Sequence, residues 1–246
     1  MQHILLYFLG LLLLTTSCNV SNNFYVNNPV PVGKGEVEGC VALGTGLEAD
    51  IDSISAIGDV YFNNEYNYAP IFYVGGQIGL GDKLDLRFAL HFPYLVGGFG
   101  IRSGIQYSLF SATSKFNMAM GTDLGFVFAK DTVTIFGADI PSEITTEGAI
   151  NADFFMPIGY SFSDQFRITL TPRYSFNGVF VRKNVNESKT KYYKPQVYGV
   201  SVGLRYKRVY VEYTSLYYKN QVIPSFGIAY LVSSKTKNKA PINYTE

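Results

Sequence analysis

Residues 166–177 read FRITLTPRYSFN, and their side chains alternate between two chemical classes. Even-numbered positions hold apolar or aromatic residues and Pro, whereas odd-numbered positions hold Arg, Thr, Ser and Asn. Successive side chains of a β-strand point to opposite faces of the sheet. The stretch therefore predicts a strand with one apolar face and one polar face. It is about twice as long as the five or six residues usual for strands of soluble proteins.

The same period of two recurs along most of the chain, between short segments that are typical of turns. We count eleven candidate strands, whereas single-chain bacterial barrels normally have an even number. Either 36–62 contributes one strand instead of two, or a further strand lies in 24–32 or 132–138. The sequence therefore predicts an all-β, antiparallel up-and-down barrel of 10–12 strands with a closed or narrow lumen. The candidate strands are 36–47, 56–62, 69–80, 84–93, 97–110, 116–129, 148–162, 165–182, 193–206, 209–218 and 221–232.

The distribution of lysine indicates whether the apolar face of the strands contacts lipid or packs into a protein core. Only 16% of the residues are charged, and every Lys falls in an expected turn, loop, strand end or tail. A Lys that faces lipid at mid-depth costs about 2–4 kcal/mol in membrane barrels, whereas a soluble barrel has no such penalty. The apolar face is also free of charge, and no helix is available to cover it. The pattern thus favours strands that cross a membrane with the polar face turned inward.

An inward polar face would place charges of both signs in a narrow lumen. Unpaired buried charges cost several kcal/mol, so we expect these residues to form ion pairs. Such pairs would either plug the barrel or line a narrow polar channel. The expected lumen charge network consists of Glu38, Asp85, Arg87, Arg102, Asp123, Asp153, Arg167, Arg173, Arg205 and Glu212.

The N-terminus reads as a targeting segment. Residues 4–14 are apolar but too short to cross a bilayer as a helix, and small residues follow before Cys18. We expect a signal peptide over 1–17. The small residues before Cys18 resemble a lipoprotein signal, in which the Cys becomes the first mature residue and carries lipid. Residues 18–34 then form a lipid-anchored or flexible linker. Without lipidation, a Cys18–Cys40 disulfide is the alternative.

The last candidate strand, 225–232, reads SFGIAYLV. It resembles the C-terminal signal that bacterial outer-membrane β-barrels present to their assembly machinery, carried here by Ser225, Gly227, Tyr230 and Val232. The resemblance implies a barrel over 35–233 in the bacterial outer membrane. It also implies membrane lipid and the barrel assembly machinery as partners. The polar tail, 234–246, extends beyond the strand where that family usually ends.

The chemistry of the chain points away from catalysis. No metalloprotease, nucleophile-elbow, CxxC or phosphate-loop pattern occurs, so we expect no enzyme, metal or cofactor. A net charge of +1 gives no sign of a nucleic-acid partner. We expect a structural, surface or narrow-channel role, and the sequence names no ligand for the loops. Two alternatives remain: a lipid-anchored soluble barrel that binds an apolar ligand, and a membrane hydrolase that uses His91.

Overall fold

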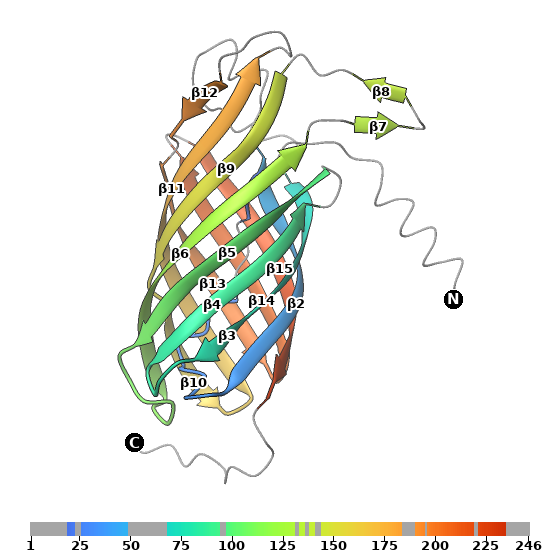
Figure 1. Cartoon of the computed structure of the whole chain (residues 1–246). Helices are drawn as coiled ribbons and strands as arrows, with labels where there is room; N and C mark the ends of the chain where they lie inside the picture. Colours follow the sequence, from blue (N-terminus) through green and yellow to red (C-terminus); the bar gives the residue numbers. More distant parts are fainter. Residues whose placement is uncertain are drawn as a thin grey trace, which may run out of the picture.

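The wall of the molecule is a sheet of long antiparallel strands that follow one another in chain order (Figure 1). The computed structural model describes residues 19–22, 26–48, 68–93, 97–130, 133–135, 138–140, 144–183, 190–194, 196–218 and 221–234. None of these residues belongs to a helix that is long and apolar enough to cross a membrane. The wall strands are β2 (Val37–Glu48), β3 (Tyr68–Gly79), β4 (Leu84–Pro93), β5 (Gly97–Ser108), β6 (Phe116–Lys130), β9 (Ile144–Phe155), β10 (Ile158–Ser163), β11 (Phe166–Lys183), β13 (Gln196–Tyr206), β14 (Val209–Tyr218) and β15 (Gln221–Ser233).

The sheet closes on itself, because β15 pairs with β2 as well as with β14. β9 and β10 act as one interrupted strand, since both lie between β6 and β11. Counting these two elements as one, the wall has ten strands. The prediction of an all-β, antiparallel up-and-down barrel of 10–12 strands is confirmed, with ten strands in the wall.

One of our eleven candidate strands is not part of the wall. β2 pairs directly with β3 along its length, so 36–62 supplies a single wall strand. The candidate strand over 56–62 lies outside the described residues. Alternation alone could not distinguish a short strand-like segment from a wall strand. A wall strand is identified by its hydrogen-bonded pairing with two neighbouring strands, which the sequence pattern does not show.

Four short strands lie outside the ten-stranded circuit. β1 (Asn19–Asn22) pairs with the end of β2, and β12 (Thr190–Tyr193) pairs with the end of β11. β7 (Val133–Ile135) and β8 (Ala138–Ile140) pair with each other. These elements lie at the end of the barrel that carries the longer connections, whereas the opposite rim has tight turns such as Lys207-Arg208 (Figure 1).

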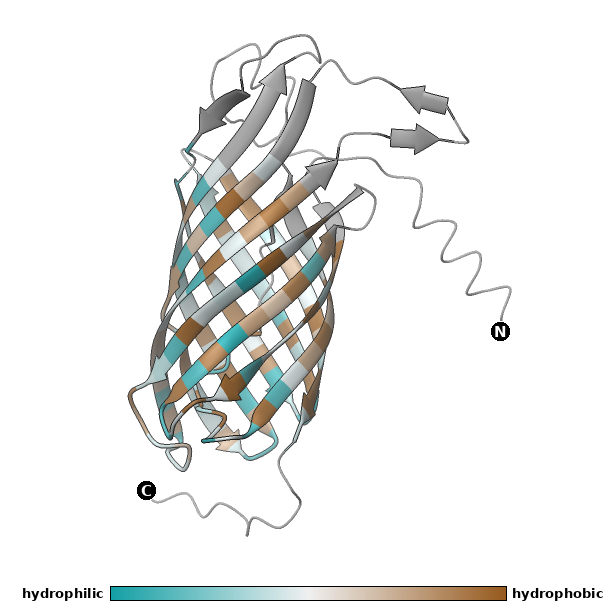
Figure 2. Cartoon of the chain, in the orientation of Figure 1, coloured by the Kyte–Doolittle hydropathy of each residue, from teal (hydrophilic) through white to brown (hydrophobic). Residues whose placement is uncertain are grey.

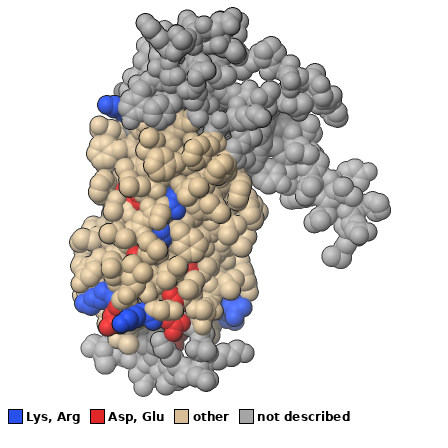
Figure 3. Space-filling model, viewed as in Figure 1, with Lys and Arg blue, Asp and Glu red and all other residues tan. Residues whose placement is uncertain are grey.

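The two faces of the wall differ sharply in chemistry. Every wall strand exposes large apolar side chains on the outside, among them Leu43, Leu124, Phe154 and Phe226. Among strand residues whose exposure is described, no Lys, Arg, Asp or Glu faces outward. Figure 2 shows hydrophobic residues alternating with polar ones along the strands, and in Figure 3 the charged residues gather mainly near the short-turn rim. The buried face, by contrast, consists largely of polar and small residues.

Candidate functional site

The interior of the barrel is the candidate site, because the predicted charges meet there. Arg87 on β4 reaches past β5 to Asp123 on β6, with Nε and Oδ1 3.3 Å apart, and both side chains are buried. Gly104 lies between them in the sheet register. A Cβ at Gly104 would overlap the Asp123 carboxylate, so the absence of a side chain leaves room for the pair. The Arg87 guanidinium also lies 4.1 Å from the centre of the Phe155 ring.

A second buried pair repeats this arrangement one strand further around the wall. Arg102 on β5 passes β6 to reach Asp153 on β9, with Nη2 and Oδ2 2.5 Å apart. Gly125 stands opposite Arg102, and a Cβ there would lie 3.2 Å from the Arg102 Nε. Asp153 also accepts a hydrogen bond from Ser175 on β11. The small residues of the inner face therefore serve as gaps through which long charged side chains reach partners two strands away.

A third pair spans the lumen itself. Arg205 on β13 donates from Nη1 and Nη2 to the two carboxylate oxygens of Glu38 on β2, at 3.2 Å and 2.9 Å. Two wall strands, β14 and β15, separate these residues in the sheet, so the bidentate bond joins non-adjacent strands on the inner side of the wall. Bidentate Arg–carboxylate bonds are both strong and directional. This pair ties β13 to β2 across the two strands that lie between them.

Residues 26–32, which we call the lumenal segment, lie inside the barrel. Asn27 donates from Nδ2 to Glu212 at 3.0 Å, and Asn28 donates from Nδ2 to Glu38 at 3.1 Å. The backbone N–H of Val32 donates to Asp85 at 3.2 Å. Val30 and Val32 are buried with 6% and 4% exposure, which excludes a solvated position for this part of the chain.

The wall also donates hydrogen bonds to the lumenal segment. Gln106 donates from Nε2 to the Asn28 carbonyl at 2.7 Å, and Ser108 donates to the Pro29 carbonyl at 3.0 Å. Arg167 donates to the side-chain oxygen of Asn28 at 2.5 Å. The lumenal segment thus provides hydrogen-bond partners for buried side chains of several wall strands. Buried polar groups in proteins generally have such partners.

The structure places the predicted network residues in two groups. Three ion pairs join six of them, and Glu38, a member of one pair, also holds the lumenal segment together with Asp85, Arg167 and Glu212. Arg173 is buried on the same inner face. The sequence placed this stretch in a linker, with a further strand in 24–32 as one alternative, and did not predict that it lies in the lumen. One available signal was the alternation Pro29-Val30-Pro31-Val32, in a stretch without charge.

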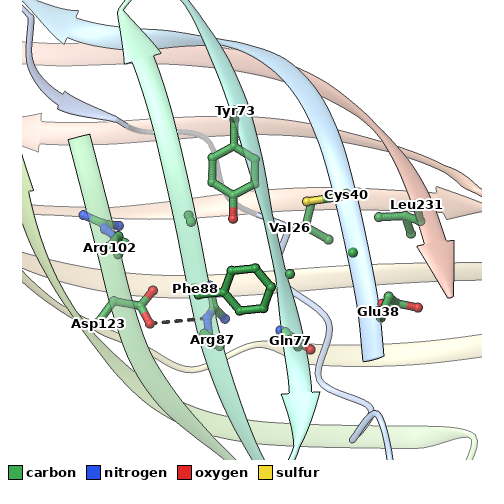
Figure 4. A pocket seen from close by; sticks show the side chains of 13 residues that line it. Val26, Glu38, Cys40, Tyr73, Gln77, Arg87, Phe88, Arg102, Asp123 and Leu231 are labelled. Carbon is green, nitrogen blue, oxygen red and sulfur yellow. Dashed lines mark ion pairs between the residues drawn. The ribbon is translucent and has the colours of Figure 1, made fainter. Parts of the chain in front are cut away.

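The space left inside the barrel is small. One cavity of the described interior is lined by residues of β2, β3, β4, β5, β6 and β15, and Val26, Tyr73, Gln77 and Arg87 contribute to its lining (Figure 4). Its volume is about 20 Å³, which is room for one or two water molecules. A drug-sized ligand needs roughly 300 Å³ or more. This cavity is therefore too small to hold a drug-sized ligand.

His91 lies within the barrel and not on its outer surface. Its side chain is 3% exposed and packs over Gly100 of β5, where a Cβ would overlap the imidazole ring. This position places the His91 of the hydrolase alternative on the inner face of β4. Within the described ranges, no group of three or more His, Cys, Asp or Glu residues is arranged to hold a metal ion.

The remaining predicted residues lie at the seam of the barrel or outside the described chain. Ser225, Gly227, Tyr230 and Val232 belong to β15, the strand that closes the barrel against β2. Ser225 and Gly227 face inward, whereas Tyr230 and Val232 are about half exposed on the outer wall. Cys18, the expected lipidation site, lies outside the described residues. Cys40 is a free, buried cysteine on the inner face of β2.

No family model matches the chain, and no curated protein matches it. The proposed function is therefore argued from the geometry of the barrel.

Proposed function

We propose that this chain is a bacterial outer-membrane β-barrel, lipid-anchored at Cys18, whose lumen is closed by its own N-terminal segment and by ion pairs. The observation that supports the proposal is the distribution of side chains across the wall. Large apolar residues face outward on every wall strand, and the charges with described side chains lie inside or at the rims. In water this outer surface would greatly exceed the few hundred Å² of contiguous apolar patch that soluble monomers expose.

The filled interior favours a structural or surface role over transport. A soluble barrel that binds an apolar ligand needs an apolar cavity of ligand size. This interior instead holds buried Arg, Asp, Glu and Asn side chains around a cavity of about 20 Å³. The same filling argues against a standing channel for solutes. In such a role, the barrel would interact with its surroundings through the residues at the long-connection rim.

Removal of the lipid anchor tests membrane insertion directly. We expect the Cys18→Ala variant to remain in the membrane fraction after alkaline extraction, because the apolar wall alone holds the barrel in the bilayer. The wild-type protein and a lipoprotein with a soluble domain serve as controls. If the Cys18→Ala variant appears in the soluble fraction as a folded protein, the barrel is not embedded and the proposal is wrong.

Planar-bilayer recording tests the closed lumen. We expect the inserted wild-type barrel to show no single-channel conductance, because the lumenal segment and the ion pairs occupy the interior. Deletion of 19–32 should produce measurable conductance, whereas deletion of the tail, 235–246, should not. Flotation of the same vesicles verifies that each protein is inserted. Steady conductance of the wild type would contradict a closed barrel.

A further inference from the structure

The two ends of the described chain leave the barrel at opposite rims. At the short-turn rim, Ser233 of β15 pairs with Glu38, and the backbone N–H of Ser234 donates to the Val37 carbonyl at 2.9 Å. At the other rim, β1 pairs with Gly46–Glu48, the end of β2. Figure 1 shows the same arrangement, with β2 running from one rim to the other. This is unexpected, because ten wall strands by themselves bring the first and last strands back to one rim.

The lumenal segment accounts for the difference, because it runs antiparallel to β2 from one rim toward the other. Near the short-turn rim, the backbone N–H of Gly35 donates to the Gly79 carbonyl at 2.8 Å. Further inside, Asn28 contacts Glu38, and Val26 packs against the cluster that contains Cys40 and Ala42.

The register of β1 completes this path. Asn22 pairs with Gly46 near the opposite end of β2. The contacts with β2 therefore advance steadily toward the long-connection rim as the residue number of the N-terminal chain falls.

The length of chain is sufficient for a complete traverse. Residues 22 and 33 are eleven peptide units apart in the sequence. An extended chain rises about 3.3 Å per residue, which gives a reach of roughly 36 Å. The apolar band of an outer-membrane barrel is about 25 Å tall. The chain between β1 and the turn at Gly33 and Gly35 can thus span the wall from rim to rim.

We propose that the lumenal segment is an eleventh crossing of the membrane, made through the barrel's own lumen, so that residues 19–22 lie on the side of the long connections, opposite the C-terminal tail. The inference rests on the proposed membrane insertion. Outer-membrane barrels direct their long connections to the cell surface and their short turns to the periplasm. The mature N-terminal end, with the lipid expected at Cys18, is then displayed at the cell surface instead of the periplasmic face.

Cysteine labelling on intact cells with a membrane-impermeant maleimide tests this topology. Each variant carries one new cysteine in a Cys40→Ala parent. Labelling of the parent itself measures the background signal. Ser21→Cys reports β1, and Ser234→Cys reports the C-terminal rim. Lys194→Cys marks the long-connection rim and Thr113→Cys marks a short turn; both native side chains are exposed. We expect Ser21→Cys and Lys194→Cys to label on intact cells, and Ser234→Cys and Thr113→Cys only after permeabilisation.

The inference is tested by which variants label together on intact cells, and this comparison does not depend on which rim faces outward. If Ser21→Cys labels together with Thr113→Cys, the N-terminal chain does not cross the lumen and the eleventh crossing is wrong. If Lys194→Cys and Thr113→Cys label equally on intact cells, the wall has no sidedness. That outcome contradicts the proposed membrane barrel itself, and the eleventh crossing with it, so the two failures are distinguishable.

Discussion

If the barrel is embedded as proposed, the substitution Leu124→Arg is expected to destabilise it in a bilayer by about 2–4 kcal/mol, because it would place a charge in hydrocarbon at mid-depth. Leu124 lies at the centre of β6 and is 58% exposed on the outer wall. Its neighbours in sequence, Asp123 and Gly125, face inward and are buried. The substitution therefore tests the environment of the outer face without disturbing the lumen.

A matched control lies on the same strand. Phe116 is the first residue of β6 and is 46% exposed, so Phe116→Arg places the same charge at the rim. At that depth the cost falls to about 0–1 kcal/mol. Urea unfolding of both variants in lipid vesicles, analysed by linear extrapolation, measures the difference. On a water-exposed wall both substitutions would stay within about 0.5 kcal/mol of wild type, a result incompatible with the proposed function.

The sequence was most informative where the structure depends on local alternation. In 166–177, the positions of Arg167, Thr169, Thr171 and Arg173 predicted an inward face, and β11 places them there. Between β-bulges, the period of two determines the face of each residue once a strand is recognised. The fold class and the identity of the buried charges follow from this rule without knowledge of the neighbouring strands.

Pairing partners and the path of the lumenal segment could not be predicted in the same way. Arg87 bonds to Asp123 although Asp85 lies on the same strand and face, because Gly104 opens a route across β5. Asn27 contacts Glu212 across a sequence separation of 185 residues. Such contacts depend on closure of the barrel, which no local pattern records.

Two prolines made the lumenal segment read as a linker. Pro29 and Pro31 lack an N–H donor and interrupt any strand-like pattern. Inside this barrel that property is tolerated, because the segment does not join the sheet and its carbonyls accept hydrogen bonds from side chains of the wall. Gly159 of β10 provides space for Pro29, where a Cβ would be only 2.6 Å from the proline ring.

Removal of one partner from the Arg102–Asp153 pair is expected to have the largest effect on stability. Asp153→Ala should lower the free energy of unfolding by about 3–5 kcal/mol, because it removes the carboxylate that forms an ion pair with the buried Arg102 guanidinium. Both side chains are almost fully buried and 2.5 Å apart, so solvent cannot replace the missing partner. As a control, Asp164→Ala removes an exposed carboxylate from a turn and should change stability by no more than about 0.5 kcal/mol.

The double variant separates the cost of an unpaired charge from a loss of packing. In Arg102→Met/Asp153→Ala no charge of this pair remains, so we expect the double variant to be more stable than Asp153→Ala alone. Urea unfolding of both single variants and the double variant in vesicles gives the coupling energy from a double-mutant cycle. If the loss of unfolding free energy in the double variant equals the sum of the losses in the two single variants, the two charges do not stabilise each other. The ion pairs would then be incidental, and the closed lumen would rest on the packing of the lumenal segment alone.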